Sequence, residues 1–385
     1  MRAGPPRHYF DWAATAPGDG EDVPDREGFP FGNPSSIHAE GRSARDLLEQ
    51  ARSRCAAALG VSPGTIYFSS GGTESNAMVI LSFLLRRGAG ICLYSAVEHP
   101  SVRENCRVLE RLGKTVGRIP VEADGRVSRA GLEQSLEKYR DCRFAAIMAV
   151  NNETGALNDM EALSTLIRGR QEPPVHIHCD MVQAAGKVPV DISRWDIDSA
   201  SVSAHKLGGP RGIGLLYLRR PLETLYRGGA QEGGIRAGTE NIAGALALAS
   251  CLERHTRPEA LDASRRGAAA RLDRLMKALE AGGRYSPIPA GRRDAEDGRF
   301  SPYILQAAFD GIPGELMVRT LDQAGFAVST GSACSSAKTE RPVLAAMGLD
   351  PTLQLGGIRI SQGWSTTGED IECLIRALGE VLNYL

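Results

Sequence analysis

The sequence predicts an α/β fold in which helices cover a mostly parallel central sheet. Apolar runs of strand length alternate along most of the chain with amphipathic helical patterns, as they do in βαβ units. The 385 residues also exceed the roughly 100–200 residues of an ordinary single domain, so two domains are expected. Ligands of such folds gather at the carboxyl ends of the strands, and functional residues are expected there.

The predicted elements alternate in chain order. A strand-like run over 66–68 precedes four apolar runs that are predicted to be buried strands, at 144–150, 175–179, 200–204 and 214–218. Amphipathic stretches typical of helices cover 39–59, 74–86, 101–112, 128–139 and 160–168. After about residue 257 the composition shifts to a long Arg-rich helical pattern and a loop rich in Gly, Pro, Arg and Asp. A second, smaller α/β module is predicted over 302–385.

Composition excludes several classes of function. The 45 basic and 46 acidic residues give a net charge of −1, which provides no electrostatic footprint for nucleic acid or an anionic membrane. The eight cysteines are scattered without a C-x-x-C pair, so neither a zinc finger nor a disulfide scaffold fits, and a reducing, cytoplasmic setting is expected. The longest nearly apolar run, 242–252, is shorter than the roughly 20 residues of a spanning helix. No signal peptide and no membrane segment are predicted.

Lysine is rare, since only six of the 45 basic residues are lysine, and one of the six stands apart. Lys206 follows the apolar run 200–204 and precedes Leu207-Gly208-Gly209-Pro210. An amine at the end of a buried strand can be desolvated and its pKa lowered, which suits a Schiff-base nucleophile; a lysine whose amine reaches solvent is the alternative. The other five are interpreted as solvated charges: Lys114, Lys138, Lys187, Lys277 and Lys338.

The segment Ser69-Ser70-Gly71-Gly72-Thr73-Glu74 joins the strand-like run 66–68 to a helix. Glycines, hydroxyls and free N–H groups at a helix N-terminus form a cradle suited to a phosphate group. The segment contains neither the Gly-Lys-Ser/Thr of a P-loop nor the dinucleotide pattern G-x-G-x-x-G. A simple helix cap would have a similar sequence.

His176, His178 and Asp180 alternate along a predicted strand and therefore point to one face of it. Three metal ligands are geometrically feasible there, but the apolar surroundings disfavour that interpretation and no metal is expected. Asp180, at the strand end, could instead hold the protonated nitrogen of a pyridine ring.

Cys334 lies in a stretch of small residues, Ser329-Thr330-Gly331-Ser332-Ala333-Cys334-Ser335-Ser336. Most of the other cysteines fall in predicted strands or helices, where a free thiol is usually inert packing. A loop cysteine that can reach a site from outside is a candidate nucleophile, and an incidental exposed cysteine is the alternative.

Together with further motifs, these segments resemble the cysteine desulfurases of the class V aminotransferase group, which are pyridoxal-phosphate (PLP) enzymes of fold type I. The motifs follow in family order: Gly71-Gly72-Thr73-Glu74, Glu98-His99, Asn151-Asn152-Glu153-Thr154-Gly155, Asp180-x-x-Gln183, Ser203-x-His205-Lys206, Gly228-Gly229-x-Gln231-Glu232-x-Gly234-x-Arg236-x-Gly238-Thr239, Gly331-Ser332-Ala333-Cys334 and Arg359-Ile360-Ser361. The match extends over essentially the whole chain. It implies a large PLP-binding domain over 16–257 and a small domain, formed by 1–15 and 258–385, that carries the cysteine loop.

The resemblance also assigns roles to residues around the cofactor. Lys206 would hold PLP covalently and then act as the base that moves the substrate's α-proton. Asp180 would pair with the pyridine nitrogen, His99 would stack on the ring as a further catalytic group, and Gln183 would hydrogen-bond the phenolic oxygen. The phosphate would be held by Gly72, Thr73, Ser203 and His205, with Thr239 reaching across from a second subunit, which implies a homodimer.

Substrate roles follow in the same way. Arg359 and Asn152 would bind the carboxylate of L-cysteine, because a guanidinium can form two parallel hydrogen bonds to it. Cys334 would attack the substrate sulfur, so that alanine leaves and a persulfide remains for an unidentified protein acceptor in iron–sulfur cluster, thio-cofactor or tRNA thiolation pathways. Two alternatives remain: another PLP enzyme on this scaffold, such as a selenocysteine lyase, a cysteine lyase or an aminotransferase, and a catalytically silent sulfur-relay or interaction subunit.

Overall fold

The computed structural model describes residues 7–18, 31–86, 90–170, 174–331 and 341–385. Its α-helices are α1 (Ala39–Leu59), α2 (Gly72–Ser82), α3 (Pro100–Arg111), α4 (Arg129–Lys138), α5 (Met160–Arg168), α6 (Ile242–Thr256), α7 (Pro258–Gly282), α8 (Gly314–Gln323), α9 (Pro342–Ala346), α10 (Pro351–Gly356) and α11 (Gly368–Tyr384). Its strands are β1 (His8–Tyr9), β2 (Ile66–Ser69), β3 (Ile91–Ser95), β4 (Thr115–Ile119), β5 (Cys142–Ala146), β6 (His176–Asp180), β7 (Ser199–Ser203), β8 (Gly214–Leu218), β9 (Tyr285–Ile288), β10 (Ile304–Phe309), β11 (Phe326–Ala327) and β12 (Ile358–Ser361).

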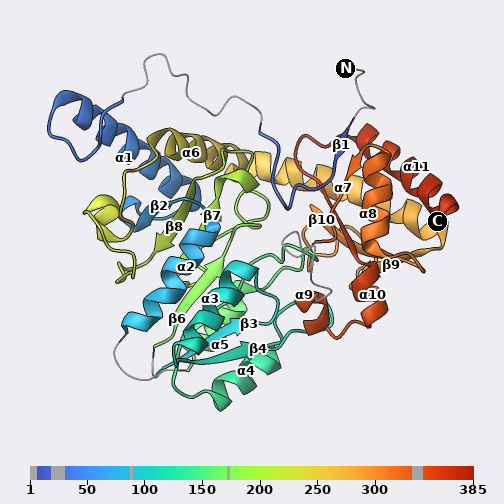
Figure 1. The fold of residues 1–385 in the computed structure, drawn as a ribbon, viewed down its shortest axis with the longest axis horizontal. Coiled ribbons are helices and arrows are strands. Elements are labelled where there is room, and N and C mark those ends of the chain that lie inside the picture. The colour runs from blue at the N-terminus through green and yellow to red at the C-terminus, as the bar shows by residue number, and fades with distance from the viewer. Residues whose placement is uncertain (1–6, 19–30, 87–89, 171–173, 332–340) are drawn as a thin grey trace.

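The central sheet has seven strands in the order β2-β8-β7-β6-β5-β3-β4 (Figure 1). The pairs from β7 to β4 are parallel, and β8 pairs antiparallel with both β2 and β7. The predicted α/β class with a mostly parallel, helix-covered sheet is therefore confirmed. A large apolar cluster joins buried residues of this sheet to α1 and α6, including Leu48, Ile177 and Leu248. The strand ends are thus fixed on a packed core.

Two smaller sheets lie in the other part of the chain, to the right in Figure 1. β10 pairs antiparallel with β9 and β12, and β1 pairs parallel with β11. The N-terminal strand thus joins the C-terminal module, although more than 300 residues separate the partners His8 and Phe326. This arrangement agrees with the expected small domain formed by 1–15 and 258–385, whose boundaries remain a prediction.

Local sequence explains where the helices next to the site begin. His99 caps α3 by accepting a hydrogen bond from the Ser101 amide, and Pro100 occupies the first turn, where its missing N–H costs nothing. α2 begins at Gly72, two residues before the predicted start, because the Ser75 amide bonds to the carbonyl of Gly71. The amides of Gly72 and Thr73 therefore belong to a helical first turn and are left without intrahelical partners.

The predicted strand 144–150 is shorter in the structure than expected. β5 ends at Ala146, and the buried residues beyond it continue toward a turn in which Asn151 accepts hydrogen bonds from the amides of Glu153 and Thr154. The amides of Ile147 and Ala149 still bond to the β6 carbonyls of His178 and Asp180, so this stretch lies buried beside β6 and has the apolar pattern of a strand. β3 and β4 were absent from the predicted strands, and β4, an edge strand, has two exposed residues among its five.

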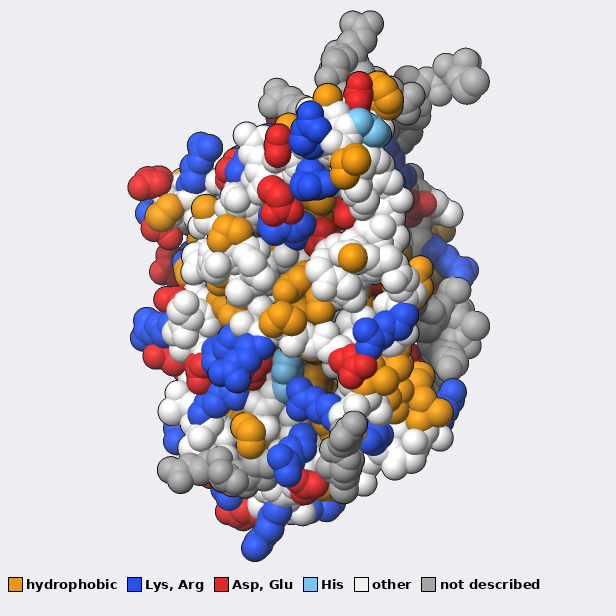
Figure 2. All heavy atoms as spheres, turned by 90° about the vertical axis from the view of Figure 1, so that its left-hand side faces the viewer, with side chains coloured by type: hydrophobic (Ala, Val, Ile, Leu, Met, Phe, Trp, Pro, Cys, Tyr) orange, Lys and Arg blue, Asp and Glu red, His pale blue; other side chains and the backbone are white. Residues whose placement is uncertain are grey.

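The last features of the fold are the distribution of side chains on the surface and the length of the apolar helices. On the face shown in Figure 2, basic and acidic side chains are intermixed, with hydrophobic side chains between them. Within the described part of the chain, no helix is both long and apolar enough to cross a membrane.

Candidate active site

Three of the predicted site residues, Asp180, Lys206 and His99, follow parallel strands of the central sheet. Asp180 is the last residue of β6, and Lys206 ends a short 3-10 helix, η3 (Ala204–Lys206), that directly follows β7. β6 and β7 are paired in parallel, with Asp180 opposite Ser201. His99 follows β3 in the same way. The carboxyl ends of these strands meet at one edge of the sheet, as expected for ligand sites of α/β folds.

Lys206 is held against the N-terminal segment. Its Nζ donates to the carbonyl oxygens of Ala13 and Ala14, each at 2.6 Å. The same segment is fixed to the residue before the lysine, because the Ala16 amide bonds to the His205 carbonyl at 2.8 Å and Thr15 Oγ1 lies 2.9 Å from His205 Nδ1. The amine is thus placed over the strand ends by polar contacts of its own chain.

Asp180 is buried and oriented by two donors. Its Oδ1 accepts from the Val182 amide at 2.9 Å, and its Oδ2 accepts from Asn76 Nδ2 at 2.8 Å. Asn76 in turn places its Oδ1 2.9 Å from His178 Nε2, while His178 Nδ1 lies 2.8 Å from Ser199 Oγ. Because an amide oxygen only accepts, His178 carries its proton on Nε2 and accepts from the Ser199 hydroxyl. His178 therefore orients a carboxylate through Asn76.

This network makes stability depend on pH. Burial lowers the pKa of His176 and of His178 to about 3, below the roughly 6.5 of an unfolded histidine. The unfolded state therefore binds more protons in acid, so the stability contributed by these neutral rings is complete above pH 6.5 and is lost as pH falls toward 3. We expect the unfolding free energy to fall by up to about 1.4 kcal/mol per pH unit for each ring.

Denaturant unfolding of the wild type and of His178→Asn between pH 7.5 and pH 5 checks this expectation. The variant lacks one titrating group, so its stability should fall less steeply with acidification even where its absolute stability is lower. Equal slopes in the two proteins would contradict a neutral, buried His178.

His99 lies close enough to the other predicted residues for their charges to act on it. Its pKa is lowered, chiefly by burial, then by the positive charges of Lys206, Arg103 and Arg359, while the Asp180 carboxylate opposes the shift. Its Nδ1 accepts the Ser101 amide hydrogen, so the neutral ring carries its proton on Nε2. A neutral imidazole is suited to stack on an aromatic ring.

Gly72 and Ser203 lie together beside the start of α2. A Cβ at Gly72 would come within 2.5 Å of Val182 Cγ2 and 3.8 Å of Ser203 Cβ, so only glycine fits here without displacement. Thr73 is exposed at the first turn of α2. Burial, then Lys206, lowers the pKa of His205 to about 4, so His205 is neutral at pH 7. Free helix amides, hydroxyls and a neutral imidazole are a donor set that suits a phosphate.

The same donor set fits PLP as a whole. It combines this phosphate cradle with an amine on Lys206, a buried carboxylate on Asp180 and an imidazole on His99, all at one sheet edge. The described residues contain no group of three or more His, Cys, Asp or Glu side chains placed to hold a metal ion.

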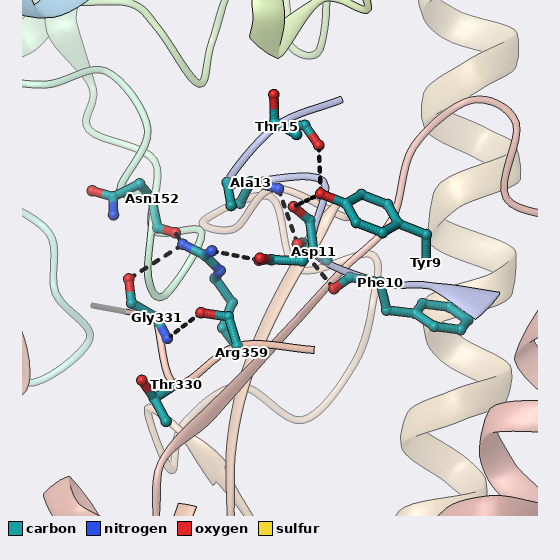
Figure 3. A network of polar contacts seen from close by, with 12 residues as sticks. Tyr9, Phe10, Asp11, Ala13, Thr15, Asn152, Thr330, Gly331 and Arg359 are labelled. Atoms are coloured by element: carbon teal, nitrogen blue, oxygen red, sulfur yellow. Dashed lines mark hydrogen bonds and ion pairs between the residues drawn. The ribbon is translucent and has the colours of Figure 1, made fainter. Parts of the chain in front are cut away.

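Arg359 lies at the centre of a network that joins the two parts of the chain (Figure 3). Its two terminal nitrogens donate to Asp11 Oδ1 at 2.7 Å and to the Asn152 carbonyl at 2.8 Å, and a longer contact of 3.4 Å reaches the Gly331 carbonyl. Arg359 is buried, and neither its Nε nor Asn152 Oδ1 has a partner among the described residues. These two buried polar atoms are available to a bound carboxylate and amine.

The predicted nucleophile, Cys334, lies outside the described residues, as does Lys338. Residues on either side of the undescribed segment contact each other: the Arg341 guanidinium donates to the Thr330 carbonyl. Arg341 also lies 3.7 Å from the buried Glu153 carboxylate. Gly331, which directly precedes the undescribed residues, belongs to the Arg359 network, and Arg341, which directly follows them, contacts Thr330.

Two further predictions differ in outcome. Thr239 is exposed, and an ion pair between Arg236 and Glu74 ties its loop to α2. The assignment of Thr239 to the site of a partner subunit stays a prediction.

Lys187 was interpreted as a solvated charge, which is wrong: it is only 3% exposed, and its Nζ donates to Gln183 Oε1 at 2.9 Å. Its position four residues after Gln183, within one helical turn, was a signal that could have revealed the contact.

Sequence reasoning gave no role to Asn76 or Asp11, which orient Asp180 and Arg359. Asn76 lies one turn beyond Gly72, and Asp11 ends the segment Tyr9-Phe10-Asp11, where the resemblance to the family begins, so both lay close to residues already singled out. Their contacts span more than 100 residues in sequence, and no local pattern encodes such distances.

Comparison with known proteins identifies the family. The sequence model of the aminotransferase class-V family matches residues 8–374. The chain belongs to this family. It is 36% identical to the cysteine desulfurase IscS of Dictyoglomus turgidum, with 98% of this chain and 95% of that protein covered. It is 35% identical to the cysteine desulfurase NifS of Azotobacter vinelandii, with 98% and 93% covered.

Solved structures agree with these relatives. A NifS-like protein superposes with a TM-score of 0.89 at 30% identity, covering 98% of this chain and all of the other. SspA, solved in complex with cysteine, superposes with a TM-score of 0.78 at 28% identity, covering 94% of this chain and all of the other. The predicted fold type and the predicted enzyme family, the cysteine desulfurases of class V, are confirmed.

Proposed function

We propose that this enzyme uses PLP to convert L-cysteine to L-alanine and transfers the sulfur to Cys334 as a persulfide. The observation that carries the proposal is that Lys206, Asp180 and His99 follow strands of the central sheet at its carboxyl edge, and that the charges of Lys206, Asp180 and Arg359 all act on His99. An amine, a carboxylate, an imidazole and a guanidinium in this arrangement match the four tasks of the reaction. These are cofactor attachment, ring protonation, ring stacking and substrate binding.

The residues that would hold the cofactor follow from their positions. Lys206 would bind it covalently, Asp180 would keep the pyridine nitrogen protonated, Gln183 would donate to the phenolic oxygen, and His99 would cover one face of the ring. When bound, PLP supplies an electron sink for the bond broken at the substrate's α-carbon. The phosphate would be held by Gly72, Thr73, Ser203 and His205, together with Thr239 of a second subunit.

The chain's own groups would then bind the substrate and move its protons. Arg359 and the Nδ2 of Asn152 would donate to the α-carboxylate, Asn152 Oδ1 would accept from the α-amine, and the Lys206 amine would take the α-proton. The Cys334 thiolate would attack the substrate sulfur, the S–S bond would form as the Cβ–S bond breaks, and a proton would complete the methyl group of alanine. Cysteine and the enzyme thiol thus give alanine and an enzyme persulfide, with no external oxidant.

Chain length supports the role of Cys334. Three residues of polypeptide span at most about 10 Å, and Cys334 follows Gly331 by three residues. The Gly331 carbonyl already contacts Arg359. This short sequence distance from a residue that contacts Arg359 supports Cys334 as the proposed nucleophile.

A product assay tests the proposal. The purified PLP-loaded protein is incubated with L-cysteine, and alanine, protein-bound sulfane sulfur and the cofactor's visible spectrum are measured. Alanine and sulfane sulfur should form in a 1:1 ratio in the first turnover. Alanine without sulfane sulfur, or turnover of selenocysteine alone, would assign the chain to another PLP enzyme, and an unchanged spectrum without products would assign it to a silent relay subunit.

The proposal also includes a homodimer and a protein that accepts the sulfur. A homodimer is supported by the family's use of a partner threonine and by the exposure of Thr239. The persulfide would pass to a protein acceptor in the cytoplasm, where reducing conditions keep thiols available. Five buried cysteines in the described part of the chain form no disulfide: Cys55, Cys92, Cys106, Cys142 and Cys179.

A further inference from the structure

The side chain of Lys187 is buried inside the protein and is directed toward the site. It lies at the end of a turn that follows β6, in which the Lys187 amide bonds to the Ala184 carbonyl. The residue is 3% exposed, and its Nζ donates to Gln183 Oε1 at 2.9 Å. Burial of an amine is costly, so this position requires a reason beyond solubility.

The contacts of Gln183 supply that reason. Its Oε1 accepts from Lys187, and its Nε2 donates to the Ala13 carbonyl at 2.8 Å. An amine on lysine can donate to this oxygen in either protonation state, whereas a carbonyl oxygen only accepts, so the orientation of the carboxamide is fixed. Lys206 Nζ bonds to the same Ala13 carbonyl at 2.6 Å. The NH2 group of Gln183 is therefore turned toward the side of the lysine amine.

Without Lys187, the carboxamide would lose this constraint. Gln183 is 4% exposed, so its oxygen would be buried without the donor that it now has. Lys206 shares the Ala13 carbonyl with Gln183 and is the donor next to it. Rotation of the amide would then present oxygen in place of NH2 to that neighbour.

Charge alone does not explain Lys187. Its pKa is lowered to about 7, chiefly by burial and further by the positive charges of Lys206 and Arg359. Lys187 itself lowers the pKa of His205. Above neutrality its amine is therefore mostly uncharged, and the hydrogen bond to Gln183 remains its principal effect.

We propose that Lys187 is a positioning residue that fixes Gln183 with its NH2 group toward the cofactor site. This inference rests on the proposed function, in which Gln183 donates to the phenolic oxygen of PLP. A donor at that oxygen stabilises its deprotonated form, so it lowers the pKa of the cofactor chromophore that shares a proton with the Lys206 nitrogen. Lys187 would thus set the protonation of the bound cofactor without touching it.

The test is a pH titration of the visible spectrum of the PLP-loaded enzyme. In Lys187→Met the midpoint should rise by roughly one pH unit, as for the loss of one hydrogen bond to a charged group. We expect kcat to fall about tenfold with KM changed less than about twofold, because the carboxylate ligands are intact. Lys277→Met, on exposed surface, is the matched control and should match the wild type in both measurements.

Two more variants separate orientation from charge. Lys187→Gln keeps a donor but no charge and should restore the wild-type midpoint to within about half a unit. If Lys187→Met does not fold, Lys187→Leu removes the same donor and should raise the midpoint equally. In a Gln183→Leu background, Lys187→Met should cause no further shift, because no amide remains to be oriented. Any of three results would overturn the inference. These are a wild-type midpoint in Lys187→Met, a raised midpoint in Lys187→Gln, and a midpoint in the double variant that is raised over that of Gln183→Leu by as much as Lys187→Met raises it over wild type. Failure of the wild type to show cofactor absorption would instead refute the proposed function.

Discussion

Cys334→Ser should lower the transfer of sulfur from L-cysteine by at least about a thousandfold while leaving cofactor and substrate binding intact. A hydroxyl at neutral pH is a far weaker nucleophile than a thiolate, and it cannot store sulfur as a persulfide. The groups proposed to bind PLP and the substrate carboxylate belong to the sheet edge and the Arg359 network. The change at position 334 should not disturb them.

Alanine, sulfane sulfur and the cofactor spectrum measured side by side check this result. The variant should show the spectral response to cysteine and form no persulfide. Cys373→Ser is the control, since Cys373 lies on α11, is partly exposed and is free, and its replacement should leave activity unchanged. Sulfur transfer by Cys334→Ser at the wild-type rate would show that the thiol of Cys334 is not the nucleophile.

Lys206→Ala should lower alanine formation by at least about a thousandfold and remove the covalent attachment of the cofactor. The amine now contacts the Ala13 and Ala14 carbonyls at the edge where Asp180 and His99 gather. Alanine supplies neither the nucleophile that binds PLP nor the base that moves the α-proton. The phosphate cradle is unaffected, so non-covalent PLP binding should persist.

Borohydride reduction followed by mass analysis of peptides checks this result. The wild type should carry the reduced cofactor on Lys206, and the variant should carry none. Lys187 is a second lysine near the site; it is buried, and its pKa, lowered to about 7, gives it a reactive amine. A reduced adduct on Lys187 in the unaltered protein would falsify the assignment of Lys206.

Local patterns predicted the elements whose sequence carries a strong period or a distinct boundary. The helices α1 and α5 have the predicted bounds, and the apolar runs around β6, β7 and β8 are strands within one residue of their predicted ends or at them. The edge strand β4 escaped prediction because Gly117 and Arg118 interrupt its apolar pattern. The run beyond Ala146 was extended too far because buried turns and buried strands have the same hydropathy.

The site residues also divide into those that local sequence patterns identified and those that they did not. Lys206, Asp180, His99 and Arg359 could be selected from the sequence because each follows a recognisable strand end or motif, and together they identified the family. Lys187 was mistaken for a surface charge, because its spacing from Gln183 indicates a contact but not burial, which depends on how the turn after β6 packs against the N-terminal segment.

By itself, the sequence determined the fold class, the family and the residue types that the chemistry needs, because periodicity and motif order are local properties of the chain. Only the tertiary structure decided which groups orient them. Asn76 holds Asp180 from 104 residues away, and Asp11 holds Arg359 from 348 residues away. The first contact arises from the packing of α2 on β6 and the second from the pairing of the N-terminal segment with β12, and hydrogen bonds between distant residues leave no periodic trace in a single sequence.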